Sequence, residues 1–574
     1  MRSWFYSFAC DMVLMITIAV IVSIVSEYLD FVANVNKFTA FIVKSIEAVA
    51  SAITSTYTNY TTAVSTKVTN IYDVYTTYAT AISRQSYIDS ILLIEVCTKI
   101  NFTLLSLAVL ASSILMYNSW IRSEDNTYYK FSFILPFVFF VSLFIQLYII
   151  YLFITMQPFT WTSTNLSKSI SYTLIWIPFN SNLTIDLFGS TLILLAYIIG
   201  FLSMLNFYDR TYWLSYRHSL LFNLFILVVI IFVSCDDVYI FFIFYELLLL
   251  PSFLLVYFSS PNKKGIQASL YFLIWTQLGS LLVYLAVNYI VTLVGSSSAV
   301  DIKNYKFSKD DIWILKILLF VGFGFKIPIY PLHYWLTKTH VEAIGSFSMY
   351  LSGFLVKTAL FGFYKFSLIL NSSEINIICV CIALIGVVDA SFKLWNQVDL
   401  KKLVAFCTIQ EMNLIVICFL YGFTNVAFIG ILFCIMHAIL SSLMFFLVDC
   451  IQRRYQSRQT VEVVGIIHTT PNLGLSLIAM VLLFLAVPGT LKFSCEFMLF
   501  CFMTDVSYPL SFILIIAASS IAPISFVRVW YGSIFGSPSK KHQINNDLTH
   551  KEILVISLCI LLLIFLSSIS YNFF

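Results

Sequence analysis

The chain has 574 residues, of which 60% are apolar, 17% are aromatic and only 10% are charged. A soluble domain usually carries about 25% charged residues, so this composition excludes a soluble fold and indicates a protein that lies in lipid. The net charge of +4 is small and the Lys and Arg residues are scattered, which excludes a surface that binds nucleic acid.

Apolar stretches recur along almost the whole chain, and about 20 mainly apolar residues are enough to cross a bilayer. We therefore predict an all-α, polytopic transmembrane bundle of about 14–15 spans. The predicted spans are residues 11–29, 98–117, 131–155, 184–206, 218–236, 238–258, 267–293, 312–331, 344–370, 376–395, 401–421, 425–449, 472–503, 508–531 and 552–573.

The first part of the chain differs from the rest, because residues 30–90 are rich in Thr, Ser, Tyr, Ala and Val. This segment is too polar to cross a bilayer. It could form an amphipathic surface helix, an arm that binds a partner or a disordered segment, and we favour a helix packed on a partner subunit. No presequence rich in Arg and Ser precedes the first span, so we expect an organelle-encoded or bacterial protein.

Basic residues follow every second span when residues 98–117 are counted as the first. Excess Lys and Arg stays on the cytoplasmic or matrix side of a membrane, so these loops are predicted to share one side. The loop 301–311 on the other side also carries Lys, but its Asp residues balance the charge. The basic residues are Arg122, Lys130, Arg210, Arg217, Lys263, Lys264, Lys338, Lys401, Lys402, Arg453, Arg454, Arg458, Lys540 and Lys541.

Four predicted spans carry an ionisable side chain, namely Glu246, Lys326, Lys357 and Glu496. Each charge inside a span costs roughly 2.5–3.5 kcal/mol on insertion scales, so these residues need a compensating role. Burial favours the neutral forms of both Lys and Glu, and a neighbouring opposite charge restores the charged forms. An alternating Glu/Lys series is therefore predicted to act as a switchable proton relay.

Structural roles are the alternative for buried charges, because a Lys near a helix end can extend to the membrane surface and a Glu–Lys pair can tie two helices. This alternative is favoured for Lys365 and Glu374, which lie near a span end. His437 and Glu411 lie well inside their spans and are further relay candidates, although His437 could also be a hydrogen-bonded core residue. His333 lies at the end of the Lys326 span, close to loop water.

Two spans contain helix-breaking residues next to a charge. Pro328 and Pro331 follow Lys326, and Pro488 precedes Glu496 by eight residues. The two segments lie five spans apart, which is the offset that two inverted five-helix repeats with discontinuous helices would give. We accordingly divide the chain into an N-terminal extension, N-terminal spans, two repeats and a C-terminal loop and span. These parts are residues 1–90, 91–206, 207–370, 371–535 and 536–574.

The twelve cysteines stand singly apart from Cys379 and Cys381, and they contain no CxxC motif. This spacing does not suit an iron–sulfur cluster or zinc, and the seven histidines do not pair at positions suited to haem. We therefore expect no cofactor, metal or redox centre on this chain.

An ordered set of motifs resembles subunit 4 of mitochondrial NADH dehydrogenase, an antiporter-like subunit in the membrane arm of respiratory complex I. The resemblance covers roughly residues 180–535. The motifs are Tyr245-Glu246 through Pro251, the stretch from Lys326 to Ala343, Leu355-Val356-Lys357, Asp399-Leu400-Lys401, His437, Pro488-Gly489, Phe493 and Cys495-Glu496-Phe497.

The resemblance implies that Glu246 and Lys326 modulate the input side, that Lys357 is the central relay residue, that His437 links onward and that Glu496 serves the outlet. This sequence departs from the family at Glu411, where a His is usual. Further departures are Cys495 in place of Gly, Ile344 in place of Pro, and residues 1–90, which have no clear counterpart.

The resemblance thus predicts a proton-translocating subunit of NADH:ubiquinone oxidoreductase in the mitochondrial inner membrane, with other membrane-arm subunits as partners. Residues 1–90 would contact lineage-specific subunits, while NADH, flavin, iron–sulfur centres and quinone would sit on other chains. The alternatives are a subunit of a multi-subunit cation/proton antiporter and a scaffold without transport activity. The buried Lys357 and Glu496 argue against the scaffold.

Overall fold

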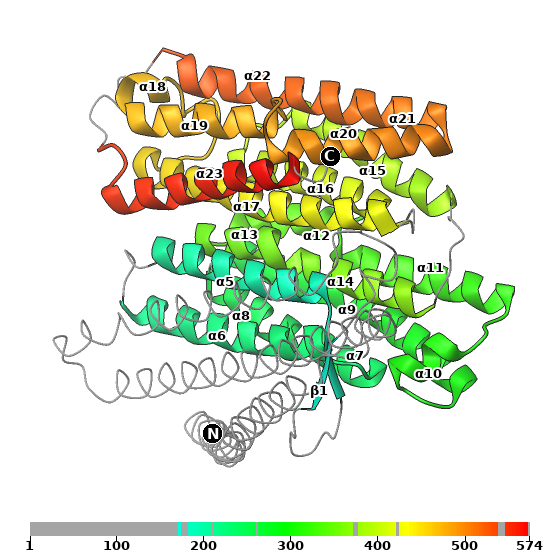
Figure 1. Ribbon diagram of the computed structural model, residues 1–574. Helices are drawn as coiled ribbons and strands as arrows, with labels where there is room; N and C mark the ends of the chain where they lie inside the picture. The colour runs from blue at the N-terminus through cyan, green and yellow to red at the C-terminus, as the bar shows by residue number, and fades with distance from the viewer. Residues whose placement is uncertain are drawn as a thin grey trace, which may run out of the picture.

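The computed structural model describes residues 170–173, 182–207, 212–259, 262–370, 377–420, 424–537 and 546–571. The predicted spans 11–29, 98–117 and 131–155, the polar segment 30–90 and Glu374 lie outside the described residues. The described helices lie side by side and nearly parallel, with the green first half of the chain next to the yellow and orange second half (Figure 1). This arrangement is the predicted transmembrane bundle.

One β-hairpin precedes the helices. Strands β1 (Ile170–Thr173) and β2 (Asn182–Ile185) pair in antiparallel fashion, with Ile170 opposite Ile185. The all-α prediction missed this hairpin, because its two strands are only four residues long and lie between two predicted spans. The described residues are otherwise helical or irregular.

The first half of the bundle contains helices that follow the predicted spans closely, with the additional short helices α10 and α12. Its elements are α5 (Leu187–Phe207), α6 (Tyr212–Ser234), α7 (Val238–Leu247), α8 (Leu249–Ser259), α9 (Lys263–Val294), α10 (Ala299–Asn304), α11 (Lys309–Lys326), α12 (Tyr334–Glu342), α13 (Gly345–Tyr350), the π-helical turn η1 (Leu351–Leu355) and α14 (Val356–Ile369).

The second half has the same character. Its elements are α15 (Ile377–Trp395), α16 (Leu400–Leu420), α17 (Thr424–Tyr455), α18 (Ile466–Thr469), α19 (Pro471–Phe484), α20 (Leu491–Val506), α21 (Tyr508–Ile515), the π-helical turn η2 (Ile516–Ile521), α22 (Ala522–Phe535) and α23 (His550–Tyr571). Within the part of the chain that the structure describes, seven helical stretches are long and apolar enough to cross a membrane.

Two helices are interrupted where the sequence predicts it. Helix α11 ends at Lys326 and α12 begins at Tyr334, so the predicted span 312–331 ends earlier than expected. Proline removes a backbone donor and clashes with the preceding turn, which explains the end of α11 two residues before Pro328. The second interruption separates α19 from α20 and contains Gly489 in a left-handed conformation (φ +99°).

Two five-helix units share the same order of features. The side chain of Asp237 accepts hydrogen bonds from two backbone N–H groups at the start of α7, and Asp399 does the same at the start of α16. Each Asp also forms a β-bridge with a later loop, Asp237 with Ser298 after α9 and Asp399 with Gln459 after α17. A broken helix and then a helix with a π-helical turn follow in both units, as the predicted repeats require. The division of the chain into domains stays a prediction.

The second unit is inverted relative to the first. The continuous helix α13–η1–α14 begins near Asp399, because Lys401 donates a hydrogen bond to the carbonyl of Ala343 (2.9 Å). The same helix ends near Asp237, because Lys365 donates to the carbonyl of Cys235. The two capped helix starts therefore lie at opposite ends of the bundle.

Helices α16 and α17 form the centre of the bundle. The apolar part of α16 is 94% buried and that of α17 is 89% buried, whereas α9 is 39% buried and α23 is 33% buried. Ionisable groups in the middle of α16 and α17 are therefore enclosed by other helices, while α9 and α23 face the surroundings.

Candidate functional site

Lys357 lies at the middle of the bundle, directly after the π-helical turn η1, and its side chain is fully buried. A π-helical turn is wider than an α-helical turn and often marks a functional site. The Lys357 Nζ atom donates to the carbonyl of Ser352 (2.5 Å) and contacts His437 Nδ1 on α17. The turn thus directs a buried amine towards a histidine of the central helix.

From His437 a row of ionisable side chains continues through α16 to α20. His437 Nε2 lies 3.9 Å from Glu411 Oε2, and the other carboxylate oxygen of Glu411 is 2.7 Å from Lys492 Nζ. Lys492 Nζ lies 3.6 Å from Glu496 Oε1. All five members, including Lys357, are between 0% and 5% exposed. The row therefore offers a path for protons that is enclosed by protein.

The structure places most of the predicted relay residues in this row and corrects one link. The sequence predicts that His437 connects Lys357 with Glu496. In the structure His437 instead lies next to Glu411, and Lys492 lies between Glu411 and Glu496. Lys492 was missed. Its position four residues before Glu496, within a buried helix, is the pattern that could have identified it.

Glu246 and Lys326 form a separate pair at the edge of the helix bundle. Lys326 is buried, and its Nζ atom lies 4.1 Å from the centre of the Tyr245 ring. Glu246 is half-buried and interacts electrostatically with Lys326, but among the described residues it forms no ion pair within 4.0 Å. No hydrogen bond or ion pair within the described ranges joins Lys326 to Lys357. The two sites are therefore not joined by direct contacts in the described part of the chain.

Two histidines lie shortly before α13, one at each end of α12. His333 Nε2 lies 3.2 Å from Lys393 Nζ, next to Asp389. His340 is fully buried against the ring of Phe445 (centroids 4.4 Å apart), and neither of its ring nitrogens has a hydrogen-bond partner in the described part of the chain. The buried His340 nitrogens can therefore accept or donate to water.

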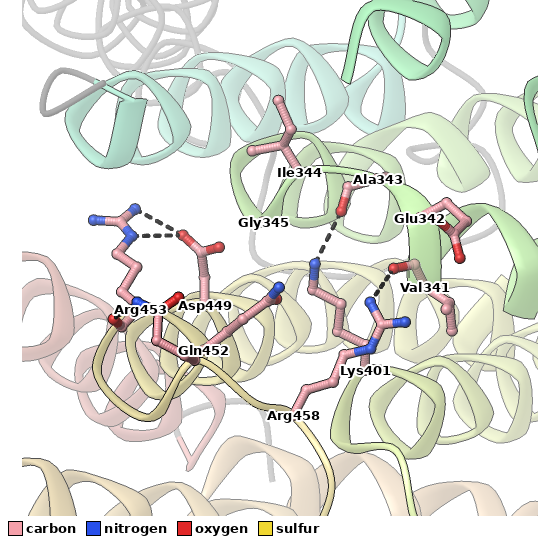
Figure 2. A pocket seen from close by; sticks show the side chains of 11 residues that line it. Val341, Glu342, Ala343, Ile344, Gly345, Lys401, Asp449, Gln452, Arg453 and Arg458 are labelled. Carbon is pink, nitrogen blue, oxygen red and sulfur yellow. Dashed lines mark hydrogen bonds and ion pairs between the residues drawn. The ribbon is translucent and has the colours of Figure 1, made fainter. Parts of the chain in front are cut away.

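A pocket of about 480 Å³ begins at Val341, the residue after His340, and its lining includes Glu342, Lys401, Asp449 and Arg453. Figure 2 shows Arg453 directed towards Asp449 and Lys401 directed towards a backbone carbonyl at the start of α13. The pocket thus lies between segments that belong to the predicted basic loops. Those loops gather at one end of the bundle, as their charge predicts.

Lys365 does not join the row. It lies at the far end of α14 and donates a hydrogen bond to the backbone carbonyl of Cys235. This contact ties α14 to the start of α7 and fits the structural role that the sequence favours.

Comparisons with known proteins agree with this geometry. The chain matches the family described as NADH:quinone oxidoreductase/Mrp antiporter over residues 235–522. It is 47% identical over 392 residues to NADH-ubiquinone oxidoreductase chain 4 of Paramecium tetraurelia, which covers 68% of this chain and 82% of that protein. It is 28% identical over 341 residues to chain 4 of Marchantia polymorpha, which covers 57% of this chain and 67% of that protein.

Two solved structures share the fold. A chain of respiratory complex I from Thermus thermophilus superposes with a TM-score of 0.67 at 18% identity, covering 81% of this chain and 95% of that chain. A chain of the Mrp complex from Dietzia sp. DQ12-45-1b gives a TM-score of 0.65 at 17% identity, covering 77% and 81%.

Proposed function

The chain belongs to the NADH-ubiquinone oxidoreductase chain 4 family, and from this premise we propose which of its residues move protons. It is a proton-translocating, multi-pass membrane subunit of complex I in the mitochondrial inner membrane, and its partners include other membrane subunits of that complex. Its similarity to chain 4 is more specific than its likeness to the Mrp antiporter, so cation/proton antiport is the second candidate.

The proposed relay runs from Lys357 through His437 and Glu411 to Glu496. The observation that carries this proposal is the unbroken row of buried ionisable side chains that joins α14, α17, α16 and α20. Neighbouring members of the row, with Lys492 between Glu411 and Glu496, lie within about 4 Å of one another. Such buried ionisable groups in membrane proteins commonly mark proton paths.

The pocket at the basic end is the proposed inlet. Its position at the end with the basic loops places it on the matrix side. His340 lies beside it and is close enough to Lys357 and Lys401 to interact with both electrostatically. Water in the pocket would deliver a proton to His340, and from there the proton would reach Lys357.

Glu246 and Lys326 are the proposed modulator of this inlet. Glu246 lies on a face of α7–α8 that exposes Ile243, Leu247 and Leu250, so a neighbouring membrane subunit can cover it. Covering Glu246 would change its charge or distance from Lys326, and the altered field would act on the relay. Residues 1–90 would contact a lineage-specific subunit, because the resemblance leaves them without a counterpart.

The redox reaction is proposed to occur on other subunits, since the cysteine spacing does not suit a redox centre. The second candidate function is tested by transport in reconstituted vesicles. Proton movement that requires sodium would favour the antiporter. Proton movement that follows NADH oxidation in sodium-free medium supports the relay.

Replacing Lys357 by Met tests the relay. In the assembled complex, reconstituted into liposomes, we expect Lys357→Met to lower proton translocation at least about tenfold, because a proton relay contributes factors of this size or larger. Lys365→Met is the matched control, since it removes a buried amine from the same helix outside the row. Proton translocation at the parent rate in an assembled Lys357→Met complex would refute the proposal.

A further inference from the structure

Lys492 lies between two carboxylates in the centre of the second unit. Its Nζ atom is 2.7 Å from Glu411 Oε1 on α16 and 3.6 Å from Glu496 Oε1, one turn further along α20. The amine also lies over the ring of Phe484, 3.7 Å from its centre. All three ionisable groups are nearly inaccessible to solvent.

This cluster contains two carboxyl groups, Glu411 and Glu496, but only one amine, that of Lys492. If both carboxylates were ionised while His437 and Lys357 were neutral, one negative charge would remain uncompensated in the interior. An uncompensated buried charge is strongly unfavourable, so a proton is expected on one of the two carboxyl groups. Besides its two carboxylates, the charged or titratable groups that act on Lys492 are Cys407 of α16 and His437 of α17. The cluster is thus a site for one exchangeable proton.

The two carboxylates are unequal in the structure. Glu411 receives the hydrogen bond from Lys492, whereas Glu496 Oε1 has no hydrogen-bond partner among the described residues. Lys492 is the second residue of α20, directly after the helix break that contains Gly489. Lys492 has a long side chain and lies at a helix start next to irregular backbone. A small movement can therefore transfer its amine from Glu411, at 2.7 Å, to Glu496, at 3.6 Å.

The first unit contains a comparable Glu–Lys pair, with Lys326 before the break in its helix and Lys492 after the break. Glu246 and Glu411 both lie on the second helix of their units, and Lys326 and Lys492 both flank the break in the fourth helix. In each unit the amine lies over an aromatic ring, that of Tyr245 or that of Phe484. The second unit therefore has its own Glu–Lys pair, with Glu496 added as an alternative partner.

We propose that Lys492 is a positioning residue that selects which of Glu411 and Glu496 holds the proton of the relay. The proposal rests on the proton path given above and adds a two-position switch to it. With Lys492 on Glu411, Glu411 is ionised and Glu496 carries the proton. The structure shows Lys492 in this position, next to Glu411.

The cycle moves one proton at a time and needs no electrons. Glu496 gives its proton to water on the outlet side, which breaks the Glu496 O–H bond and forms a new O–H bond on water, and the resulting carboxylate attracts Lys492. Glu411, without its partner, then accepts the proton of His437 Nε2 while the Lys357 ammonium gives a proton to His437 Nδ1, so the ring stays neutral. When Lys492 returns to Glu411, the proton passes from Glu411 to Glu496, and Lys357 takes up a new proton from the inlet.

The variant Lys492→Met tests this switch in the assembled complex. It leaves both carboxyl groups of the relay in place, so a purely structural role of Lys492 predicts lower stability but proton translocation at the parent rate. The switch predicts a rate as low as that of Lys357→Met. The matched control is Lys393→Met, which removes the amine of an ion pair of 2.6 Å outside the relay and should pump at the parent rate.

The outcomes separate the two proposals. Parent-level pumping in Lys492→Met together with loss in Lys357→Met overturns the switch alone. Parent-level pumping in Lys357→Met overturns the relay itself.

A second measurement on the parent complex avoids any dependence on assembly of the Lys492→Met variant. Infrared difference spectra during NADH oxidation report protonation of buried carboxyl groups, and Glu411→Gln and Glu496→Gln assign the bands. The switch predicts two bands of opposite sign, one from each residue. A Glu496 band without a Glu411 band would overturn it.

Discussion

The two Glu–Lys pairs of the molecule have the same plan and different environments. In the first unit, Lys326 is buried but its partner Glu246 is half-buried and forms no ion pair within 4.0 Å in the described structure. In the second unit, Glu411 and Lys492 are both buried and lie 2.7 Å apart. The inverted repeat thus places the Glu246–Lys326 pair where a neighbouring subunit can contact it. It places the Glu411–Lys492 pair where only residues of this chain contact it.

Neutralising the carboxylate of each pair should separate the two pairs most clearly. Glu411→Gln leaves the buried Lys492 with only the more distant Glu496, so we expect a loss of about 3 kcal/mol, near the lower end of the cost of breaking a buried ion pair. Glu246→Gln should change stability by less than about 1 kcal/mol, because it breaks no ion pair. Thermal unfolding of the two purified complexes measures the difference. Equal losses would show that the pairs are equivalent.

A glycine substitution should disturb the first pair alone. A Cβ atom at Gly279 of α9 would lie 2.6 Å from the carbonyl oxygen of Gly322 and 2.7 Å from Phe325 Cβ, so α11 must shift. Overpacking of this kind costs about 1–3 kcal/mol, and the shift would move Lys326. Gly532→Ala is the control, because nothing lies within 4 Å of its Cβ position. Unfolding temperatures equal in both variants would contradict the predicted contact.

The aromatic contact of Lys326 should have the smallest effect. Tyr245→Leu removes a ring 4.1 Å from the Lys326 amine, and a cation–π contact of a partly shielded amine contributes about 1 kcal/mol. We expect a small loss of stability and a modest fall in pumping, measured in the same liposomes. The change should be smaller than that of Glu411→Gln, and a larger one would mean that Tyr245 itself takes part in proton transfer.

Much of the fold could be predicted from the sequence, because hydrophobic length and helix breakers act locally. The break before α20 follows from Pro488-Gly489, and the common end of the basic loops follows from their charge. Helix α12 was not predicted, since YWLTKTHVE is short and partly polar. The β1–β2 hairpin was missed for the same reason.

The site was predicted in part. Lys357, His437, Glu411 and Glu496 stand out as charges within apolar spans, and the structure places them in one row. The ion pair that completes the row joins residues 81 positions apart, and no local pattern specifies such a contact. The partial exposure of Glu246 also depends on packing between helices, so apolar neighbours in sequence predicted a deeper position than the structure gives.

His437 is the junction of the proposed path, because it contacts Lys357 on one side and faces Glu411 on the other. The most direct test is the rate of proton translocation during NADH oxidation by His437→Gln complexes in liposomes. Glutamine retains hydrogen bonding but cannot carry the proton, so the account predicts the same low rate as Lys357→Met, with assembly unchanged. Proton translocation at the parent rate would contradict a relay through this row.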